Sequence, residues 1–541
     1  MSRSPATYVV QLTQFSGVEV NAHLVLDKQP TRQDIKLKTL SNYVQQHPSG
    51  WKKRLELAEL LYSMGHWQEA VQEYRQVLQR QPHLMQVRLQ LGKILQLMGR
   101  QADAIAVYQS ALFLSPNMAT QNHLNGLIEV CRCCPQQAVR LFESAASLEP
   151  NNPAHWYALG QVHLEAESPV AALRSFDAIL SRNPDDIVAL SWSYDPLLAV
   201  GNFQEAQRRL EQALKLAPND CRTLERLATH RCYQGLVWGE EGKQTRQLIR
   251  AALRLAPDSA NAHQVLSLYH LHRGEWEKGV AVLLQFAQQH PQSPGGWYHY
   301  AWCLFHTGYF QGAADAILKA YRLYQNDCEI YRALCEILPA AGRLGELHQV
   351  AIQSTTPPSP HCPLSSASLV EEMLDRFPQR WSVWVSAGRV LVEGFKDLER
   401  GCRVSATGVQ LQPQLADAWF RHGRVLALAG RHREAVEALN HGWQWLPQQG
   451  DYMRSVPAAL WLGESYQALG DEARSRKWWE EGYQRAQAML EFNLATAYYW
   501  QGKTLSALGD MTGAKRAYRS ALSQHLPYPA CEEVKEALKH L

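Results

Sequence analysis

Residues 85–118 read MQVRLQLGKILQLMGRQADAIAVYQSALFLSPNM, and the pattern within this stretch decides the fold of the chain. Two small residues, Gly92 and Ala104, would let a pair of antiparallel helices approach closely. Two large ones, Leu95 and Tyr108, would fill the space between those helices. The stretch therefore predicts a unit of two helices joined by a turn.

Signals that end both helices lie in the same stretch. Gly99 would end the first helix, because a residue free of Cβ strain is needed where the chain leaves it. Pro116 would stop the second helix before the next unit begins. One such pair cannot bury its own apolar face, so neighbouring pairs must stack.

The same pattern returns when the sequence is shifted by about 34 residues. Each copy places an aromatic residue, a glycine, an alanine and a large apolar residue in the same order. The clearest copies are 153–186 with Trp156, Leu159, Gly160, Ala172, Phe176 and Pro184; 416–449 with Trp419, Gly423, Gly430, Ala435, Leu439 and Pro447; and 495–528 with Tyr498, Gly502, Gly509, Ala514, Tyr518 and Ala521.

This pattern resembles the tetratricopeptide repeat, whose signature is W-x2-L-G-x2-Y, then A-x3-F, then P. The resemblance covers residues 36–528 and implies an all-α fold, an α-α superhelix (solenoid) of about thirteen repeats. The repeats are expected at 51–84, 85–118, 119–152, 153–186, 187–220, 221–259, 260–293, 294–327, 328–361, 381–415, 416–449, 456–489 and 495–528.

The register of the repeats breaks at one clear place. Residues 355–365, TTPPSPHCPLS, contain prolines that forbid a helix. They would separate an N-terminal array, 36–354, from a C-terminal array, 366–528. The solenoid could bend there, or the segment could be a surface loop without a role, and the sequence leaves both open.

A short helix should follow this loop and end before Pro378. Ser368 and Glu371 have the spacing of a capping box at its start. Its phase is that of a second helix in a repeat whose first helix has been replaced by the loop.

The two ends of the chain differ from the repeats. Residues 1–35 form an N-terminal arm, within which 7–26 alternate as in a strand, so a short hairpin or an extended arm is expected. Residues 36–47 would be a lone second helix at the start of the array. Residues 529–541 would be a C-terminal capping helix.

Composition narrows the class of protein. The 541 residues carry a net charge of +3, which argues against nucleic-acid binding by bulk electrostatics. No signal peptide and no membrane span is expected, because no stretch approaches about 18 apolar residues. The 11 cysteines are scattered and odd in number, which favours a reducing cytoplasm.

Motifs for catalysis or metal binding are weak, and no catalytic residue, metal, cofactor or small-molecule substrate is predicted. The segment around Gly242 and Lys243 resembles a phosphate-binding loop, but Gln244 stands where serine or threonine is required. It is interpreted as a loop that widens a repeat. Cys131, Cys133 and Cys134 lack a second pair of ligands and are interpreted as incidental thiols, with redox sensing or metal binding as the alternative.

The resemblance implies that the first helix of each repeat lines a concave groove. The groove positions are about the second, fifth, sixth, ninth, twelfth and thirteenth residues, which share one helical face. Neither the lysine and asparagine clamp of chaperone-binding members nor the asparagine ladder of members attached to sugar-transferring enzymes is found there.

Aromatic residues and arginines stand at these groove positions instead. Such side chains often carry the binding energy of protein interfaces, although each aromatic could instead pack between helices and each arginine could lie on a solvated face. The candidate partner-binding residues are Tyr298, His299, Trp302, Phe305, Arg389, Phe420, Arg421, Arg424, Trp461 and Trp500.

These observations favour a non-catalytic scaffold or assembly adaptor that binds a partner protein in the groove. The alternative is a regulatory subunit that binds and gates a separate catalytic chain. An RNA-binding helical repeat protein is less favoured, because the groove positions are irregular and often apolar.

Overall fold

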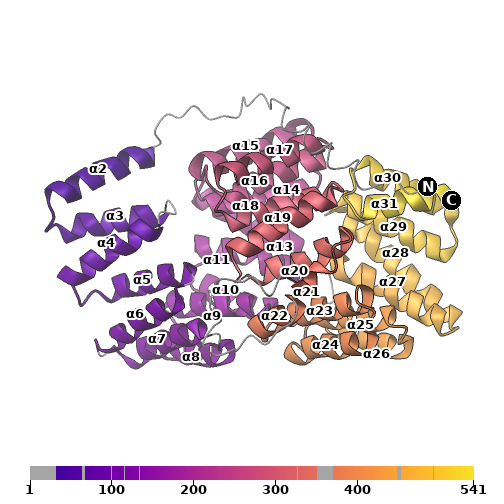
Figure 1. The fold of residues 1–541 in the computed structure, drawn as a ribbon, viewed down its shortest axis with the longest axis horizontal. Coiled ribbons are helices and arrows are strands. Elements are labelled where there is room, and N and C mark those ends of the chain that lie inside the picture. Colours follow the sequence, from indigo (N-terminus) through magenta and orange to yellow (C-terminus); the bar gives the residue numbers. More distant parts are fainter. Residues whose placement is uncertain are drawn as a thin grey trace. The chain divides into compact units, whose positions relative to one another are not determined.

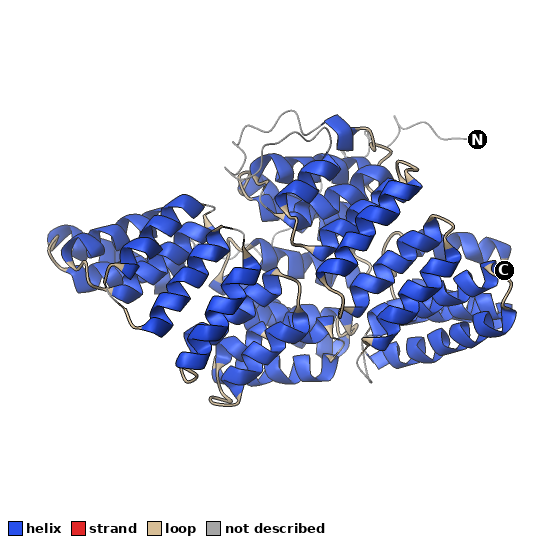
Figure 2. Ribbon diagram, turned by 90° about the horizontal axis from the view of Figure 1, so that it is seen from below, coloured by secondary structure: helices blue, strands red, loops and turns tan. Residues whose placement is uncertain are grey.

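The computed structural model describes residues 32–63, 67–98, 100–114, 116–132, 134–200, 202–325, 327–349, 369–446, 452–491 and 493–541. Every regular element within these ranges is a helix, so the all-α prediction is confirmed (Figure 2). The predicted hairpin at 7–26 and the predicted loop at 355–365 lie outside the described residues.

The chain divides into two compact units between Ser193 and Tyr194. The described helices of the first unit are α2 (Arg32–Gln46), α3 (Trp51–Ser63), α4 (Trp67–Arg80), α5 (Met85–Leu97), α6 (Gln101–Leu112), α7 (Met118–Cys131), α8 (Pro135–Leu148), α9 (Pro153–Glu165), α10 (Pro169–Leu180) and α11 (Ile187–Trp192) (Figure 1). They form successive antiparallel pairs from α3 onward, and α2 packs alone on α3 with Leu40 and Val44 buried.

The second unit continues with the same pairing. Its described helices are α12 (Tyr194–Ala199), α13 (Phe203–Leu216), α14 (Cys221–Tyr233), α15 (Gly239–Leu255), α16 (Ala260–His272), α17 (Trp276–Gln289), α18 (Pro294–His306), α19 (Phe310–Leu323), α20 (Cys328–Ala340), α21 (Glu346–Gln349), α22 (Leu369–Arg376), α23 (Trp381–Glu393), α24 (Leu398–Leu411), α25 (Ala416–Leu428), α26 (His432–Gln444), α27 (Tyr452–Ala468), α28 (Glu472–Ala488), α29 (Leu494–Leu508), α30 (Met511–Ser523) and α31 (Ala530–His540) (Figure 1).

The first helix of the repeat at 187–220 is broken into α11 and α12. Pro196 explains the break, because its ring would clash with the carbonyl of Trp192 four residues earlier and it has no N–H to donate. The boundary between the two units falls at this break.

Glycines on the first helices set the distance to the second helices, as predicted. A Cβ on Gly126 would lie 2.6 Å from the ring of Phe142, and one on Gly160 would lie 2.7 Å from Phe176. In the repeat used to define the pattern, a Cβ on Gly92 would likewise clash with the buried ring of Tyr108. The helices approach so closely that no side chain fits at these positions.

A tryptophan at the start of several first helices fastens each repeat to the one before it. The indole nitrogens of Trp156, Trp297, Trp384 and Trp419 donate to the carbonyl oxygens of Pro150, Pro291, Pro378 and Pro413, at 2.9, 3.0, 2.9 and 2.8 Å. Each of these prolines lies in the turn two residues after the last residue of the previous second helix, where its carbonyl oxygen has no partner within a helix. The tryptophan and the proline of the repeat signature therefore work together to join neighbouring repeats.

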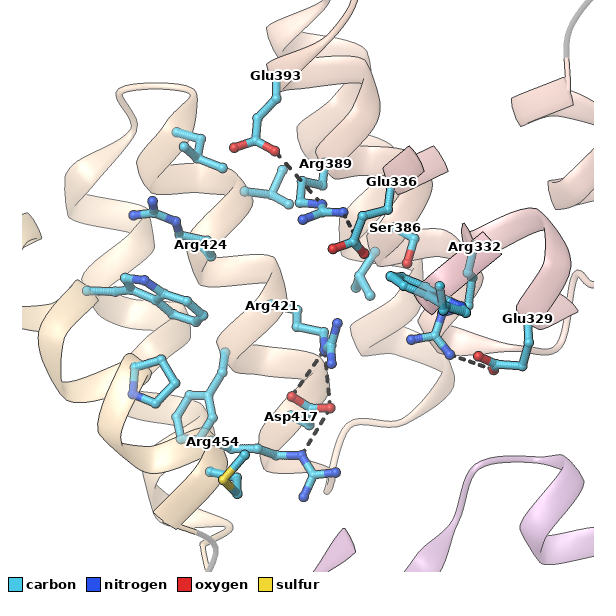
Figure 3. Close-up of a pocket in the computed structure, with 18 residues that line it drawn as sticks. Glu329, Arg332, Glu336, Ser386, Arg389, Glu393, Asp417, Arg421, Arg424 and Arg454 are labelled. Carbon is cyan, nitrogen blue, oxygen red and sulfur yellow. Dashed lines mark hydrogen bonds and ion pairs between the residues drawn. The ribbon is translucent and has the colours of Figure 1, made fainter. Parts of the chain in front are cut away.

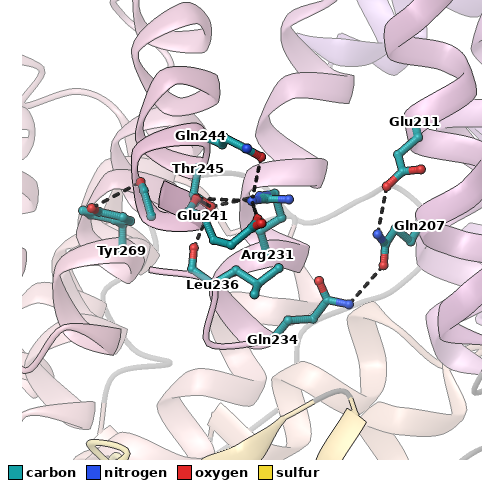
Figure 4. Close-up of polar contacts among 10 residues, drawn as sticks. Gln207, Glu211, Arg231, Gln234, Leu236, Glu241, Gln244, Thr245 and Tyr269 are labelled. Atoms are coloured by element: carbon teal, nitrogen blue, oxygen red, sulfur yellow. Dashed lines mark hydrogen bonds and ion pairs between the residues drawn. The ribbon is translucent and has the colours of Figure 1, made fainter. Parts of the chain in front are cut away.

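The segment that was compared with a phosphate-binding loop is a widened turn followed by a helix. Gly242 and Lys243 lie within α15, and the Thr245 hydroxyl donates to the carbonyl oxygen of Leu236 at 2.7 Å (Figure 4). Arg231 donates to the Thr245 hydroxyl at 2.9 Å and also binds Glu241. These bonds hold the turn against its own repeat. The sequence interpretation placed Gly242 and Lys243 in a loop, whereas the loop ends before them and both lie in the helix that follows.

The short helix α22 packs as a second helix, but its first helix is not missing. The buried carboxylate of Glu372 accepts from Tyr331 on α20 at 2.7 Å and from Tyr321 on α19 at 2.9 Å. The first helices α20 and α23 pack directly on each other. Residues 328–380 therefore form one repeat whose second helix is made by α21 and α22, with an insertion between them.

One hydrophobic cluster extends across this predicted seam, from Val280 on α17 to Val390 on α23. The core is therefore continuous on both sides of the insertion. A bend between the two predicted arrays stays a prediction.

The second unit also makes contact with itself over long sequence distances. The N–H of Tyr528 donates to the carbonyl oxygen of His306 at 3.2 Å, and His306 Nδ1 lies 3.1 Å from the carbonyl oxygen of Tyr528. The Tyr528 ring packs on Phe305 and Phe310, with centroids 5.3 and 4.5 Å apart. Arg454 on α27 donates to the carbonyl oxygen of Ala199 on α12.

Candidate functional site

A cavity of about 580 Å³ opens on the first helices of the second unit. Its walls come from α18, α20, α23, α25 and α27, which are consecutive first helices (Figure 3). Trp302 on α18 and Trp461 on α27 stand at its two ends in the chain order. The cavity therefore lies on the face of the solenoid that the resemblance assigned to binding.

The groove positions expected from the repeat signature supply most of the lining. Those on α20 are Glu329, Arg332 and Glu336; those on α23 are Val385, Ser386, Arg389 and Glu393; those on α25 are Asp417, Phe420, Arg421, Arg424 and Leu428; and those on α27 are Pro457 and Trp461. Helical spacing places these residues on one face of each helix.

Six of the ten candidate residues are brought together here, and four are not. The six that line the cavity are Trp302, Arg389, Phe420, Arg421, Arg424 and Trp461. Of these, Phe420 is only 1% exposed and packs in the core, so its contribution to the wall is mainly structural.

The other four candidates have partners within the chain. Phe305 is buried against Tyr528, and His299 Nε2 lies 3.0 Å from the side-chain oxygen of Asn261. Tyr298 packs edge-on against Trp302. Trp500 packs against Tyr499, with centroids 4.8 Å apart, among the C-terminal helices.

The centre of the site is a carboxylate between two guanidinium groups. Arg421 Nε lies 3.2 Å from both oxygens of Asp417, and Arg454 Nε lies 3.2 Å from one of them (Figure 3). Burial raises the pKa of Asp417, but Arg421 and Arg454 outweigh burial and hold it below its ordinary value. Asp417 therefore stays ionised and orients both arginines.

The remaining arginines of the lining also have acidic neighbours. Arg332 binds Glu329 at 2.7 Å. Arg389 lies 3.4 Å from Glu336 and 3.8 Å from Glu393. These pairs are partly exposed, so each contributes little to stability and can exchange partners.

Arg424 joins the charged and aromatic parts of the cavity. It lies 3.2 Å from Glu464 and its guanidinium is 5.4 Å from the centre of the Trp461 ring. The aromatic face attracts the cation at this distance.

The acidic residues and Arg454 were missed as site residues in the sequence. Glu329, Arg332, Glu336, Glu393 and Asp417 occupy groove positions, so a search for charged residues there could have found them. Met453 and Arg454 lie in the first turn of α27, which begins at Tyr452, before the predicted repeat at 456. No local signal marked that extension.

Two of the three clustered cysteines, Cys131 and Cys134, lie within the described residues. Cys131 is buried and accepts a hydrogen bond from Gln96 Nε2 at 3.0 Å, whereas Cys133 lies outside the described residues. Among the described residues, no group of three or more histidine, cysteine, aspartate or glutamate side chains is placed to hold an ion. In that same part of the chain, no helix has the length and apolar character to cross a membrane.

Models of the tetratricopeptide repeat match the sequence at 55–119, 135–191, 246–294, 274–327 and 495–524. The chain is a tetratricopeptide repeat protein. These matches lie in both compact units, so the repeat builds both parts of this tetratricopeptide repeat protein. A comparison with curated protein sequences found no match.

Solved structures similar to this tetratricopeptide repeat protein have low sequence identity to it. Yeast Tom70 is 14% identical with a TM-score of 0.39, covering 80% of this chain and 96% of that chain. Cut9 in the APC/C hetero-tetramer Cut9–Hcn1 is 12% identical with a TM-score of 0.39, covering 99% of each. The human IFIT1 dimer with m7Gppp-AAAA is 14% identical with a TM-score of 0.37, covering 76% and 90%.

Proposed function

We propose that this protein is a non-catalytic scaffold that binds a segment of a partner protein in the cavity formed by α18, α20, α23, α25 and α27. The observation that carries the proposal is the convergence of groove positions from five consecutive first helices on one cavity. Tryptophan and arginine at such positions are the side chains that anchor protein partners.

The cavity is suited to a flexible segment of a partner. Its volume of about 580 Å³ would hold a few residues of an extended chain. No disulfide joins two of the described cysteines, which fits the cytoplasm as the compartment of this scaffold.

Site-specific photo-crosslinking tests where the partner binds. Benzoylphenylalanine replaces Met453, which lines the cavity and is 43% exposed, or Met511, which lies outside it and is 48% exposed. We expect a stoichiometric crosslinked protein from position 453 and none from position 511. Equal crosslinking from both positions would contradict binding in the cavity.

Binding of the purified crosslinked protein then provides the quantitative test. We expect Trp461→Ala to weaken binding by about tenfold or more, as for an anchor residue. The matched control is Trp445→Ala, because Trp445 is 45% exposed and lies outside the cavity. If both variants bind like the parent protein, the proposed function is wrong. If the captured protein is an enzyme, a change in its turnover on binding would identify this chain as a regulatory subunit.

A further inference from the structure

We infer that the cavity recognises an acidic side chain of the partner segment, received by Arg421 and flanked by apolar residues of the same segment. This inference rests on the proposed function and specifies the chemistry of the partner. Three observations carry it: the unused donors of Arg421, the balance of charge in the lining, and the apolar residues of that lining.

Arg421 presents donors that the protein does not use. Only its Nε is bonded, to Asp417, and its two terminal nitrogens make no hydrogen bond to any described residue. The Arg421 side chain is 46% exposed, whereas Asp417 beside it is 11% exposed. Figure 3 places Arg421 in the middle of the cavity, between Arg389 and Arg454. The outer edge of its guanidinium is therefore available to a ligand.

Asp417 fixes Arg421 without neutralising the site. The same carboxylate also lies 3.2 Å from Arg454, so two guanidinium groups share it. A carboxylate from the partner would complete this arrangement, because a guanidinium can bind carboxylates along two of its edges.

The balance of charge selects the kind of anion. Five arginines and four carboxylates line the cavity, and Glu464 beside Arg424 brings the carboxylates to five. The site therefore carries no large excess of either charge, and a single carboxylate on the unused donors of Arg421 suits it. A phosphomonoester carries nearly two charges at neutral pH and would meet repulsion from Glu336 and Glu393. A lysine or arginine of the partner would be repelled by Arg421.

Apolar residues also line the cavity. Leu428, Met453 and Trp461 keep exposed surface in this lining, whereas Val425 is 1% exposed. An apolar side chain next to the acidic one would bury its surface there, and this burial would exclude water from the ion pair. The expected ligand is thus an acidic residue with apolar or aromatic neighbours in an extended segment.

A selection on the intact protein tests the inference. A phage-displayed library of random heptapeptides is selected on the immobilised parent protein and on three variants: Arg421→Gln, Trp461→Ala and Arg476→Gln. Arg476 is the matched control, since it forms an i,i+4 pair with Glu480 on exposed α28, outside the cavity. We expect enrichment of aspartate or glutamate beside apolar residues with the parent and with Arg476→Gln. This acidic preference should disappear with Arg421→Gln.

Synthetic versions of the best peptide give the magnitude. Replacing its acidic residue by the corresponding amide should weaken binding to the parent by a factor of about 10 to 100. The same replacement should change binding to Arg421→Gln by less than about threefold. A second comparison uses the same peptide with two glycines added at its C-terminus. If this extension weakens binding as much as the amide replacement does, the bound group is the C-terminal carboxylate. That result would contradict recognition of an internal acidic side chain.

The possible failures are distinguishable. Enriched peptides that are neutral or basic, and that Trp461→Ala weakens, would overturn the inference and support the proposed function. Enriched peptides that neither cavity variant affects, or no enrichment at all, would overturn both.

Discussion

Six glycines on first helices face a large side chain on the paired helix. The pairs are Gly92 with Tyr108, Gly126 with Phe142, Gly160 with Phe176, Gly423 with Leu439, Gly463 with Trp479 and Gly502 with Tyr518. Because a protein interior is close-packed, an added methyl group at these glycines has to displace a buried side chain. The loss of folding stability that this displacement causes can be measured by changing one glycine at a time.

Gly502 gives a direct measurement of that cost. A Cβ at Gly502 would lie 2.9 Å from Tyr518 Cγ, at the root of a ring that is 5% exposed and cannot swing away. We expect Gly502→Ala to lower the free energy of unfolding by about 1–3 kcal/mol, measured by urea denaturation. Gly345→Ala is the control, because nothing lies within 4 Å of its added Cβ. Equal stability of the two variants would show that the helices can move apart at no cost.

At the scale of elements, α22 depends on one buried carboxylate. Glu372 is 1% exposed and accepts from Tyr321, Tyr331 and Arg376. The hydroxyl groups come from α19 and α20, so the carboxylate ties α22 to two helices that precede the insertion. Without it, two buried hydroxyl groups and the partly buried Arg376 would lose their acceptor.

Glu372→Ala therefore tests how α22 is held. We expect a loss of about 3–5 kcal/mol in the free energy of unfolding, because the variant leaves Arg376 without its partner in the interior. Glu480→Ala removes a carboxylate from an exposed pair with Arg476 and should cost less than about 1 kcal/mol. Similar losses in the two variants would mean that the buried network contributes no more than a surface pair.

Local patterns in the sequence were sufficient to predict the helix pairs. Two contacts define each helix pair: a glycine faces a large side chain on the paired helix, and a tryptophan binds the proline that precedes it. Both contacts lie within one repeat or between neighbours, so a short stretch of sequence is enough to predict them. The first helix that pairs with α22 was predicted to be missing, because an insertion interrupts the repeat and hides its phase. The first turn of α27 was missed because Met453 and Arg454 have no counterpart in the repeat signature.

Local patterns also predicted part of the candidate site. Arg421 and Trp461 follow from counting along a first helix, and their positions converge as the resemblance implied. Phe305 and Trp500 fit the same count, yet their ring partners are Tyr528 and Tyr499 of the chain itself. The contact of Tyr528 with α18 depends on how small rotations between repeats accumulate, which no short stretch of sequence encodes.

At the scale of the whole molecule, buried histidines make both units sensitive to acid. Burial, together with His155, lowers the pKa of His123 in the first unit to about 4. Burial lowers the pKa of His230 in the second unit to about 4, where Glu211 opposes the shift and Arg231 adds to it. The Tyr194 hydroxyl lies 3.4 Å from His230 Nδ1, and Nε2 makes no hydrogen bond to described residues.

The direction of the pH dependence follows from these lowered values. The unfolded chain takes up a proton at each histidine below about pH 6.5, whereas the folded chain does so only near about pH 4. The stabilisation that each neutral buried histidine contributes is therefore fully present above about pH 6.5. It falls as the pH is lowered toward 4, by up to about 1.4 kcal/mol per pH unit for each histidine.

Denaturation midpoints measured in urea between pH 7 and pH 5 check this expectation. His230→Leu should reduce the dependence on pH in the second unit, although it also removes the partner of the Tyr194 hydroxyl at every pH. His540→Leu, at an exposed position on α31, should leave the dependence unchanged. A parent protein whose midpoint does not fall between pH 7 and pH 5 would contradict the assignment of His123 and His230 as neutral.

The contact between Tyr528 and His306 has a consequence for the rate at which a partner can bind. It joins parts of the second unit that are 222 residues apart, and the bond from Arg454 to Ala199 joins α27 to α12 of the same unit. The cavity is lined by residues of α18 and α27, the two helices that carry His306 and Arg454. For the partner segment proposed above, we therefore expect that breaking these contacts would change the rate of its association.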